Sequence, residues 1–339
     1  MEPTFLSLFA GIGGFDLALE RTGFRCIGQI EIDPFCRRVL AARFPHAPCW
    51  LDCREFTGDG LQSPPNLLVG GFPCQGVSVA GKRRGLQDER TALFWEIIRI
   101  QKIVQAPWGL FENVPGLLSS GQRADFLTVL EALREGWPVV GYRILDSRYF
   151  GVPQRRRRVF FVCGPTEAGV AQVLFEPEGG AGHPAAGQEA GADVAHALAV
   201  GTGSGGYRYD ANGEDYIVTA TLNSGGNTGG FRTEPGEHLI AHTLRAEGAD
   251  ASEDGTGRGV PLVVAHSVRR LTPTECARLQ GFPDGWCCLC QPLEAWATDP
   301  DTAAERCRCP DGPQYRAYGN AVTVPVVEWL GRRLRECLT

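Results

Sequence analysis

The stretch Thr4-Phe5-Leu6-Ser7-Leu8-Phe9-Ala10-Gly11-Ile12-Gly13-Gly14-Phe15 decides the fold class of this chain. Its first part, Thr4–Phe9, is an apolar run of strand length. The glycines after it precede a segment in which Phe15, Ala18 and Leu19 share one face of a helix. A strand, a glycine-rich turn and an amphipathic helix in this order are typical of a βαβ unit. The sequence therefore predicts an α/β fold.

The same alternation of strands and helices continues to about residue 163. Cys26–Ile30 is the second strand candidate, and Asp33-Pro34 then supplies an N-cap and a first-turn proline for a helix. Further apolar runs predict strands at Pro48–Leu51, Leu67–Gly70, Trp108–Phe111, Val139–Leu145 and Val159–Val162. Because strands that alternate with helices favour a parallel sheet, we expect residues 1–163 to form one domain on such a sheet.

The composition excludes several classes of protein. The 339 residues are 43% hydrophobic and 21% charged, which excludes a disordered or fibrous chain and fits about two globular domains. No run of about 18 apolar residues occurs, as a transmembrane helix would need. The start Met1-Glu2-Pro3-Thr4 also lacks the basic region of a signal peptide. We therefore expect a cytoplasmic protein without a membrane partner, whose 13 cysteines are reduced thiols.

The overall charge argues against a nucleic-acid partner, but the placement of the charges does not. Lys and Arg number 33 against 39 Asp and Glu, a formal charge of −6, whereas phosphate binding needs positive charge. The basic residues are nevertheless clustered at Lys82–Arg84, Arg155–Arg158 and Arg269–Arg270. Binding through a few clustered arginines is expected to weaken sharply with salt and to involve few phosphates.

The composition changes after Cys163. Residues 164–264 hold 21 of the 44 glycines, and the helical periodicity is lost there. Three units align at 195–218, 219–240 and 241–263, and each begins and ends on a short apolar run. This regular period predicts stacked units of strand, loop and strand, with a low-complexity linker as the alternative. Helical patterns resume at Pro273–Leu279 and Val324–Cys337.

Acidic residues follow the second and third strand candidates. Glu31 comes directly after the second strand, and Asp52 follows the third. Glycines let backbone N–H groups approach a ligand at a helix N-terminus, and an acid at the next strand end can hold ribose hydroxyls. Together with the glycine loop, these acids indicate an adenosine-containing cofactor, either a dinucleotide or S-adenosylmethionine.

A thiol and a carboxyl group are expected at the same edge of the sheet. Cys74 follows the fourth strand candidate in Phe72-Pro73-Cys74-Gln75, and Glu112 follows the fifth. Most lone cysteines are packing residues, but the carboxyl end of a parallel strand is where a nucleophile belongs in an α/β enzyme. A thiol beside a carboxylic acid suits covalent attack on a ring whose nitrogen is protonated as the adduct forms.

With these residues in place, the sequence resembles the bacterial and phage DNA cytosine-5 methyltransferases over nearly its whole length. Six stretches match the motifs of that family in order: Phe9–Gly14, Pro73-Cys74-Gln75, Glu112-Asn113-Val114, Gln154–Arg158, Arg270–Pro283 and Tyr318–Val322. The resemblance implies a Rossmann-like S-adenosylmethionine domain and a smaller, irregular, β-rich target-recognition domain. We expect the catalytic domain at 1–163, the recognition domain at 164–268 and a return to the catalytic domain at 269–339.

The resemblance also implies roles for single residues. The target cytosine would be flipped out of duplex DNA, Cys74 would attack its C6 atom, and Glu112 would protonate N3. Arg156 and Arg158 would hold the cytosine carbonyl and its phosphate. The S-adenosylmethionine site would be formed by Phe9, Gly11, Ile12, Gly14, Glu31, Ile32, Asp52, Pro73, Leu93, Asn320 and Val322.

Further residues are expected to contact DNA, namely Gln75, Lys82, Arg83, Arg84 and Gln154. The first four would lie on a loop that closes over the duplex. The run Arg155–Arg158 could equally be a solvated turn before a strand. Alternate members of a strand face the same side, however, which favours a position of Arg156 and Arg158 toward the crevice that holds Cys74.

A group of cysteines lies in an insertion at 287–309. Cys287, Cys288 and Cys290 are separated from Cys307 and Cys309 by 16 residues. Four thiolates suffice for a structural zinc ion, although the C-x-C spacing is tighter than usual. We predict that Cys288, Cys290, Cys307 and Cys309 bind zinc, with partly exposed reduced thiols as the alternative.

Two other functions stay open at this point. RNA cytosine-5 methyltransferases that act on transfer RNA share these motifs, but the long insertion favours duplex DNA because readout in the major groove needs a dedicated domain. A catalytically silent DNA-binding module is the second alternative, and the presence of Cys74, Glu112 and Arg156 argues against it. We expect a monomer. A partner of a cognate restriction endonuclease, a phage-protective enzyme and a solitary regulator would have the same sequence features.

Overall fold

The three-dimensional structure is a computed structural model, and it describes residues 2–72, 92–176, 262–264 and 268–338. Several predicted residues lie outside these ranges: Pro73, Cys74, Gln75, Lys82, Arg83 and Arg84. The predicted repeats at 195–218 and 219–240 also lie outside them, as does nearly all of 241–263.

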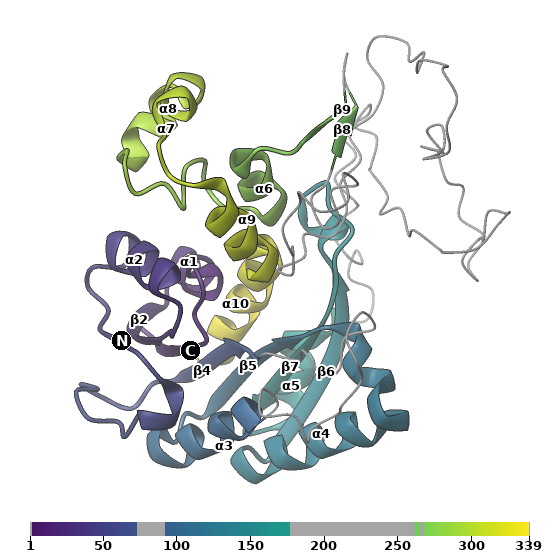
Figure 1. The fold of residues 1–339 in the computed structure, drawn as a ribbon. Coiled ribbons are helices and arrows are strands. Elements are labelled where there is room, and N and C mark those ends of the chain that lie inside the picture. Colours follow the sequence, from purple (N-terminus) through teal and green to yellow (C-terminus); the bar gives the residue numbers. More distant parts are fainter. Residues whose placement is uncertain (1, 73–91, 177–261, 265–267, 339) are drawn as a thin grey trace, which may run out of the picture.

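One mixed sheet of seven strands forms the centre of the described part (Figure 1). Its order is β3-β2-β1-β4-β5-β7-β6. The strands are β1 (Thr4–Leu8), β2 (Arg25–Ile30), β3 (Cys49–Trp50), β4 (Leu67–Gly71), β5 (Trp108–Asn113), β6 (Val139–Asp146) and β7 (Arg157–Gly164). Every strand predicted within residues 1–163 is confirmed to within a few residues, and the Rossmann-like α/β class is confirmed as well.

The prediction of a wholly parallel sheet was wrong at β7. This strand runs antiparallel to both of its neighbours, β5 and β6. Residues 147–156 form the whole connection from β6 to β7 and include the short 3-10 helix η4 (Ser147–Phe150). A parallel crossover needs a dozen or more residues, so a connection of this length returns the chain in the opposite direction.

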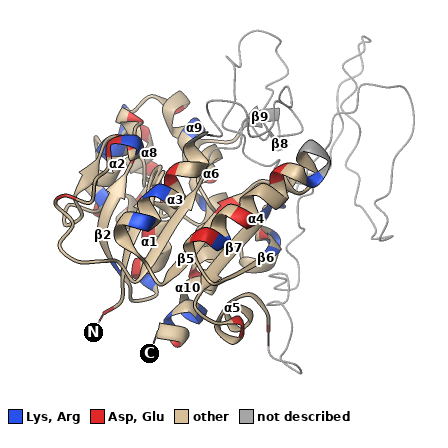
Figure 2. Ribbon diagram, turned by 90° about the horizontal axis from the view of Figure 1, so that it is seen from below, with Lys and Arg blue, Asp and Glu red and all other residues tan. Residues whose placement is uncertain are grey.

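Helices cover both faces of the sheet. On one face α1 (Gly14–Arg21) and α5 (Glu167–Leu174) contact α10 (Val324–Leu338), and these helices share a core with α2 (Pro34–Arg43). On the other face α3 (Ala92–Val104) packs against α4 (Ala124–Gly136) over a second core. Figure 2 shows that basic and acidic residues are interspersed along the outer helices and are not separated by sign.

Helix α5 was not expected. It lies in the range assigned to the target-recognition domain, but it packs on β6, β7 and α10 and so belongs to the same layered body. Thr166 caps its first turn by accepting a hydrogen bond from the Gly169 amide. Helix α5 has only eight residues, too few to give a clear period in a glycine-rich context.

The C-terminal part returns to the sheet. An antiparallel pair, β8 (Leu262–Val264) and β9 (Val268–Arg270), leads into α6 (Pro273–Gln280), which begins with a complete capping box at Thr272 and Glu275. The predicted helices at 273–279 and 324–337 are thus confirmed. Between them lie α7 (Leu293–Thr298), α8 (Pro300–Arg306) and α9 (Asp311–Asn320). Among the described residues, no helix is long and apolar enough to span a membrane.

Candidate active site

Among the predicted site residues that the structure describes, several lie at the carboxyl ends of the central strands. The glycine loop follows β1, Glu31 follows β2, and Phe72 follows β4. Glu112 lies near the end of β5, where it pairs in register with Gly71 of β4. The strand order reverses between β1 and β4, and open α/β sheets bind ligands at the carboxyl side of such a switch point.

The glycine loop is shaped by close contacts that exclude side chains. Phe9, the first residue after β1, has a positive φ of 52°, a conformation uncommon for a bulky residue. At Gly13, which has φ 82°, a Cβ atom would lie 2.4 Å from Cε2 of Phe44. At Gly14 a Cβ would lie 2.9 Å from Cγ1 of Val322. The loop is therefore packed between α2 and the segment that joins α9 to α10, and the predicted residues Gly14 and Val322 are in contact.

Glu31 braces this loop. One of its carboxylate oxygens accepts a hydrogen bond from the Gly11 amide and the other from the Asp33 amide, both at 2.7 Å. The carboxylate is buried, and burial raises the pKa of Glu31 above its ordinary value. Ile32, next along the chain, is 58% exposed. An exposed isoleucine at this edge provides an apolar surface on which an adenine ring could pack.

The other predicted cofactor residues border the same edge. Asp52 caps the short 3-10 helix η1 (Cys53–Glu55), and its carboxylate lies 2.6 Å from the guanidinium of Arg54, which lowers the pKa of Asp52. Leu93 and Phe9 are both half-buried at the margin of the α3 core. Asn320, the last residue of α9, is exposed.

Glu112 and Arg158 form an ion pair across β5 and β7. Nε of Arg158 lies 2.9 Å from Oε1 of Glu112, and both side chains are largely buried. The other carboxylate oxygen of Glu112 lies over Gly71, where a Cβ would be 3.1 Å from it. Burial lowers the pKa of Arg158, and the charge of Glu112 partly offsets that effect. The cation stabilises the carboxylate form of Glu112, and a carboxyl group at this position can exchange a proton with the nitrogen of a bound ring.

Asn113 holds the chain where the segment with Cys74 begins. Its Nδ2 donates to the carbonyl oxygen of Phe72 at 3.2 Å, and its Oδ1 accepts from the Val114 amide at 2.7 Å. Cys74 itself lies outside the described residues, and Phe72 is the last described residue before it. We did not assign a role to Asn113 from the sequence, although its place beside Glu112 at a strand end was a usable signal.

Arg156 differs from Arg158 in its described contacts. It precedes β7 instead of lying on it, so the alternation argument for a shared face does not apply to this pair. Its Nη2 donates to the carbonyl oxygens of Ala321 at 2.9 Å and Gly319 at 3.2 Å. Burial lowers the pKa of Arg156 to about 9, and the neighbouring charge of Arg158 adds to this effect. These contacts connect the arginine-rich stretch Gln154–Arg158 to the C-terminal end of α9.

Gln154, predicted to contact DNA, is fully buried. Neither Nε2 nor Oε1 of its side chain has a hydrogen-bond partner among the described residues. The exposure expected of a DNA-contacting side chain is therefore not found at this residue, and its predicted role has no support in this geometry.

A series of buried hydrogen bonds, the polar chain, links the sequence motifs Arg270–Pro283 and Tyr318–Val322 to residues 147–156, which connect β6 with β7. Thr323 accepts a hydrogen bond from the Ser147 hydroxyl and donates one to Oε1 of Gln280, each at 2.8 Å. Nε2 of Gln280 donates to the Tyr318 carbonyl at 3.0 Å. Sequence reasoning missed Thr323 and Ser147, because hydroxyl residues near a helix start are usually read as caps.

The structure brings together the four predicted zinc ligands. The sulfur atoms of Cys288, Cys290, Cys307 and Cys309 all lie within 4.8 Å of one another. The described separations are 3.5 Å between Cys288 and Cys307, 3.6 Å between Cys288 and Cys290, and 3.8 Å between Cys290 and Cys307. Such a group could hold a metal ion. Cys287 is not part of it, and its amide instead donates to the Tyr318 hydroxyl.

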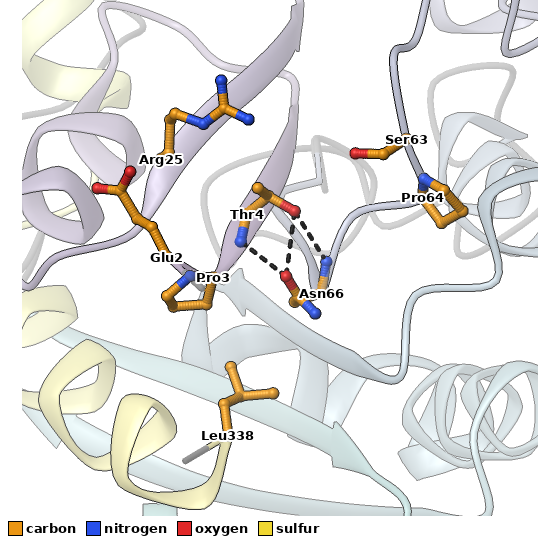
Figure 3. Close-up of a pocket in the computed structure, with 8 residues that line it drawn as sticks. All are labelled: Glu2, Pro3, Thr4, Arg25, Ser63, Pro64, Asn66 and Leu338. Carbon is orange, nitrogen blue, oxygen red and sulfur yellow. Dashed lines mark hydrogen bonds between the residues drawn. The ribbon is translucent and has the colours of Figure 1, made fainter.

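A separate pocket lies at the opposite edge of the sheet (Figure 3). It is bordered by Thr4 and Arg25, which begin β1 and β2, and by Leu338 at the end of α10. Asn66 Oδ1 accepts hydrogen bonds from the Thr4 amide and hydroxyl at 2.8 and 3.1 Å. Because the glycine loop is at the other end of β1, this pocket is not part of the candidate site.

Several known proteins are similar to this chain in sequence or in fold. A Type II methyltransferase of Haemophilus parainfluenzae, M.HpaII, is 30% identical over 99% of this chain and 90% of its own length. A protein of Escherichia phage P1 named DNA N-6-adenine-methyltransferase is 28% identical, and the match covers 99% of this chain but only 62% of that longer protein. The fold is similar to that of the Entamoeba histolytica methyltransferase EhMeth, with a TM-score of 0.60 at 13% identity over 100% of this chain and 99% of that one.

The family model described as "C-5 cytosine-specific DNA methylase" matches residues 3–175 and 208–336. These ranges contain the glycine loop, the Glu112–Arg158 pair and the polar chain around Thr323. The chain therefore belongs to the family of C-5 cytosine-specific DNA methylases, which use S-adenosylmethionine.

Proposed function

We propose that this chain methylates C5 of cytosine within a specific double-stranded DNA sequence through a covalent bond between Cys74 and C6. The observation that carries the proposal is the buried ion pair of Glu112 and Arg158, which lies one strand from Phe72, where the Cys74 segment begins. S-adenosylmethionine, when bound beside the glycine loop, supplies the methyl group.

The chain's own residues perform the remaining chemistry. The target base must leave the duplex, since C6 is inaccessible within the stack. The Cys74 thiolate forms an S–C6 bond, and Glu112 donates a proton to N3 as negative charge develops on the ring. Arg158 keeps positive charge beside Glu112 throughout. After methylation, a base removes the C5 proton, the S–C6 bond breaks to release the Cys74 thiolate, and N3 returns its proton to Glu112, which restores the neutral aromatic ring.

A duplex with 5-fluorocytosine at the target position tests this mechanism. Fluorine cannot leave C5 as a proton does, so the wild-type protein should remain covalently attached to the duplex in a denaturing gel. Cys74→Ser should form no adduct, while Cys337→Ser, which changes a half-buried thiol on α10, should form it normally. An adduct that persists in Cys74→Ser would contradict the mechanism. Methylation of transfer RNA in preference to duplex DNA would overturn the assignment of the substrate.

We propose further that the region 164–268, apart from α5, reads the DNA sequence. The support is its glycine-rich composition and the period of its three units. Removal of one unit, Thr219–Ile240, should alter the methylated sequence while S-adenosylhomocysteine still binds. Loss of cofactor binding together with the fold would contradict independent recognition units.

The cellular setting is part of the same proposal. We infer a cytoplasmic monomer that acts on duplex DNA and protects it against a cognate restriction endonuclease. The basis is the Type II name of the Haemophilus parainfluenzae relative. Sequencing of methylated cytosines in an expressing host, followed by digestion with endonucleases of the same specificity, tests this setting. Cleavage of the modified DNA at the methylated sequence would contradict the protective role.

We also propose that the four clustered cysteines bind one structural Zn²⁺. Thiolates about 2.3 Å from a tetrahedral zinc ion lie about 3.8 Å from one another, close to the 3.5 to 3.8 Å separations of the described sulfur pairs. Four sulfur ligands leave no open position for a water molecule, so the ion would be structural and would take no part in methyl transfer. Elemental analysis of purified protein should find one zinc ion per chain.

A further inference from the structure

The cysteine cluster belongs to a small unit, residues 285–310, which we call the cysteine module. One guanidinium group ties it to helix α2. Nε of Arg43 donates to the carbonyl of Trp286 at 2.9 Å, and Nη2 donates to those of Cys288 at 2.7 Å and Gly285 at 3.1 Å. The module is therefore held to the catalytic body at its first zinc-ligand candidate, Cys288, and at the residues just before it.

Trp286 connects the module to the cofactor loop. Its indole N–H donates to the carbonyl oxygen of Ile12 at 2.7 Å, and both partners are buried. Ile12 is in the glycine loop itself, so this hydrogen bond reaches the part of the backbone that would contact the cofactor. The sequence separation of 274 residues explains why no local pattern indicated it.

Trp286 also packs against the two rings that cover the loop glycines. Its ring centroid lies 5.9 Å from that of Phe44 and 5.6 Å from that of Phe282. Phe44 is the residue that leaves no room for a Cβ at Gly13, and Phe282 has its Cζ atom 3.3 Å from the Cβ position of Gly14. A shift of Trp286 would therefore be transmitted to both glycines.

The module has little apolar core of its own. Its buried cluster consists of Cys288, Trp296 and Ala303, with Trp296 closely covering Gly285. Units with so few buried side chains depend on a metal ion or on disulfides to hold one conformation. The disulfide alternative is absent, since all four cluster cysteines are free. Trp286 lies only two residues before Cys288, so the way in which the four thiols are held constrains the backbone next to Trp286.

These contacts extend the proposed zinc site, on which the following inference rests. We propose that Zn²⁺ in the cysteine module sets the affinity of the cofactor site, because it holds Trp286 in place against the carbonyl of Ile12 and the aromatic cover of the glycine loop. The metal ion would stabilise the module and would take no part in the reaction. Trp286 would be a positioning residue, because it holds the glycine loop through Ile12.

Two variants and one control test the inference, with zinc content by elemental analysis and S-adenosylhomocysteine affinity by calorimetry as the readouts. Cys290→Ser combined with Cys309→Ser should lose the zinc ion and bind S-adenosylhomocysteine about tenfold or more weakly. Trp286→Phe should keep one zinc ion and bind about threefold to tenfold more weakly, the range for loss of one hydrogen bond. Cys337→Ser should match the wild type in both measurements.

The outcomes separate the two proposals. Absence of zinc from wild-type protein overturns the zinc site and its effect on the cofactor site together. A zinc ion that is present, with unchanged S-adenosylhomocysteine affinity in Trp286→Phe, overturns the effect on the cofactor site and leaves the zinc site intact. If the double cysteine variant fails to fold by circular dichroism, Trp286→Phe alone decides, since it retains all four ligands.

Discussion

The candidate site has two halves, which hold their carboxylates in different ways. The cofactor half contains the glycine loop and Glu31, and the base half contains Glu112 and Arg158. In the cofactor half, Glu31 accepts two backbone N–H groups, and Asp16 beneath the glycine loop accepts hydrogen bonds from the neutral side chains of Ser7 and Gln29. In the base half, Glu112 is paired with a guanidinium group. Burial raises the pKa of both Glu31 and Asp16, because neutral donors offset the desolvation of a charge only in part.

This difference matches the chemistry of each half. The cofactor half needs a rigid loop and acceptors for hydroxyl groups, which local backbone contacts provide. In the proposed mechanism, Glu112 in the base half exchanges a proton with the ring, and the positive charge of Arg158 stays beside that carboxyl group in both protonation states. The comparison predicts that changes in the base half affect the rate, whereas changes in the cofactor half affect binding and stability.

The largest expected effect is on the rate of Glu112→Gln. Glutamine keeps the shape of the side chain but cannot donate a proton to N3, so the single-turnover methylation rate should fall about a thousandfold, within the range for loss of a general acid. S-adenosylhomocysteine affinity should stay within about twofold of wild type, since Glu112 is not in the cofactor half. Glu131→Gln, on the exposed side of α4, is the matched control. Equal losses of rate and cofactor affinity would break the division between the two halves.

Asp16→Asn should change how stability depends on pH. Burial raises the pKa of Asp16 from 3.8 to about 6, so its stabilising contribution is complete below pH 3.8 and is lost as the pH rises through 6. Relative to wild type, Asp16→Asn should therefore gain stability between pH 4.5 and 7, by about 2 kcal/mol.

Urea unfolding of both proteins at the two pH values measures this gain. Asp311→Asn, an exposed carboxylate at the start of α9, controls for the loss of one negative charge. A stability difference between Asp16→Asn and wild type that is the same at both pH values would mean that the hydrogen bonds of Asp16 offset its desolvation in full. The contrast between the halves would then fail.

Much of the fold was predictable because it is encoded locally. The glycines after β1, the Asp33-Pro34 start of α2 and the apolar runs of the strands are signals a few residues long, and the structure confirms them. The direction of β7 was not predictable from its own residues, because an apolar run is the same in either direction. Only the short connection after β6 carries that information.

The site was predictable in its parts but less so in its contacts. Motif positions placed Glu31, Glu112 and Arg158 at one edge of the sheet. Their partners depend on residues distant in sequence, as Arg156 shows by donating to carbonyl groups more than 160 residues away. The four clustered cysteines were predictable because their spacing limits how the insertion can fold. The bond from Trp286 to Ile12 had no such signal.

Glu31→Gln should weaken cofactor binding by about tenfold. The glutamine side chain has one acceptor oxygen, so either the Gly11 or the Asp33 amide loses its partner and the glycine loop loosens, at about the cost of one hydrogen bond. Calorimetry with S-adenosylhomocysteine measures the loss, and Glu55→Gln on the exposed side of η1 is the control. Because the pKa of Glu31 is raised, wild-type affinity should fall as the pH is lowered toward that pKa, and affinity in the variant should not. An unchanged affinity in Glu31→Gln would assign the bracing of the loop to its packing alone.

The smallest effect is expected from Thr323→Val, which tests whether the two halves are mechanically joined. Valine has nearly the shape of threonine but removes the hydroxyl between Ser147 and Gln280. The Ser147 hydroxyl can still donate to the Arg156 carbonyl, whereas Oε1 of Gln280 loses its described donor. The free energy of unfolding should therefore fall by about 1 kcal/mol, the cost of one unpaired buried acceptor.

The informative measurements on Thr323→Val are the methylation rate and the affinity for S-adenosylhomocysteine. Thr323 forms no described hydrogen bond with Glu112 or with the glycine loop, so a change in either quantity would have to pass through the polar chain. If the polar chain only stabilises the fold, both should stay at wild-type values while the unfolding midpoint falls. If the polar chain fixes the position of the base half relative to the cofactor half, the methylation rate and the S-adenosylhomocysteine affinity should fall together. Ser119→Ala, which removes an exposed hydroxyl bonded to a carbonyl in η3, should change none of the three quantities. A joint loss in Thr323→Val would show that the two halves, although their carboxylates are held differently, depend on one buried hydroxyl for their alignment.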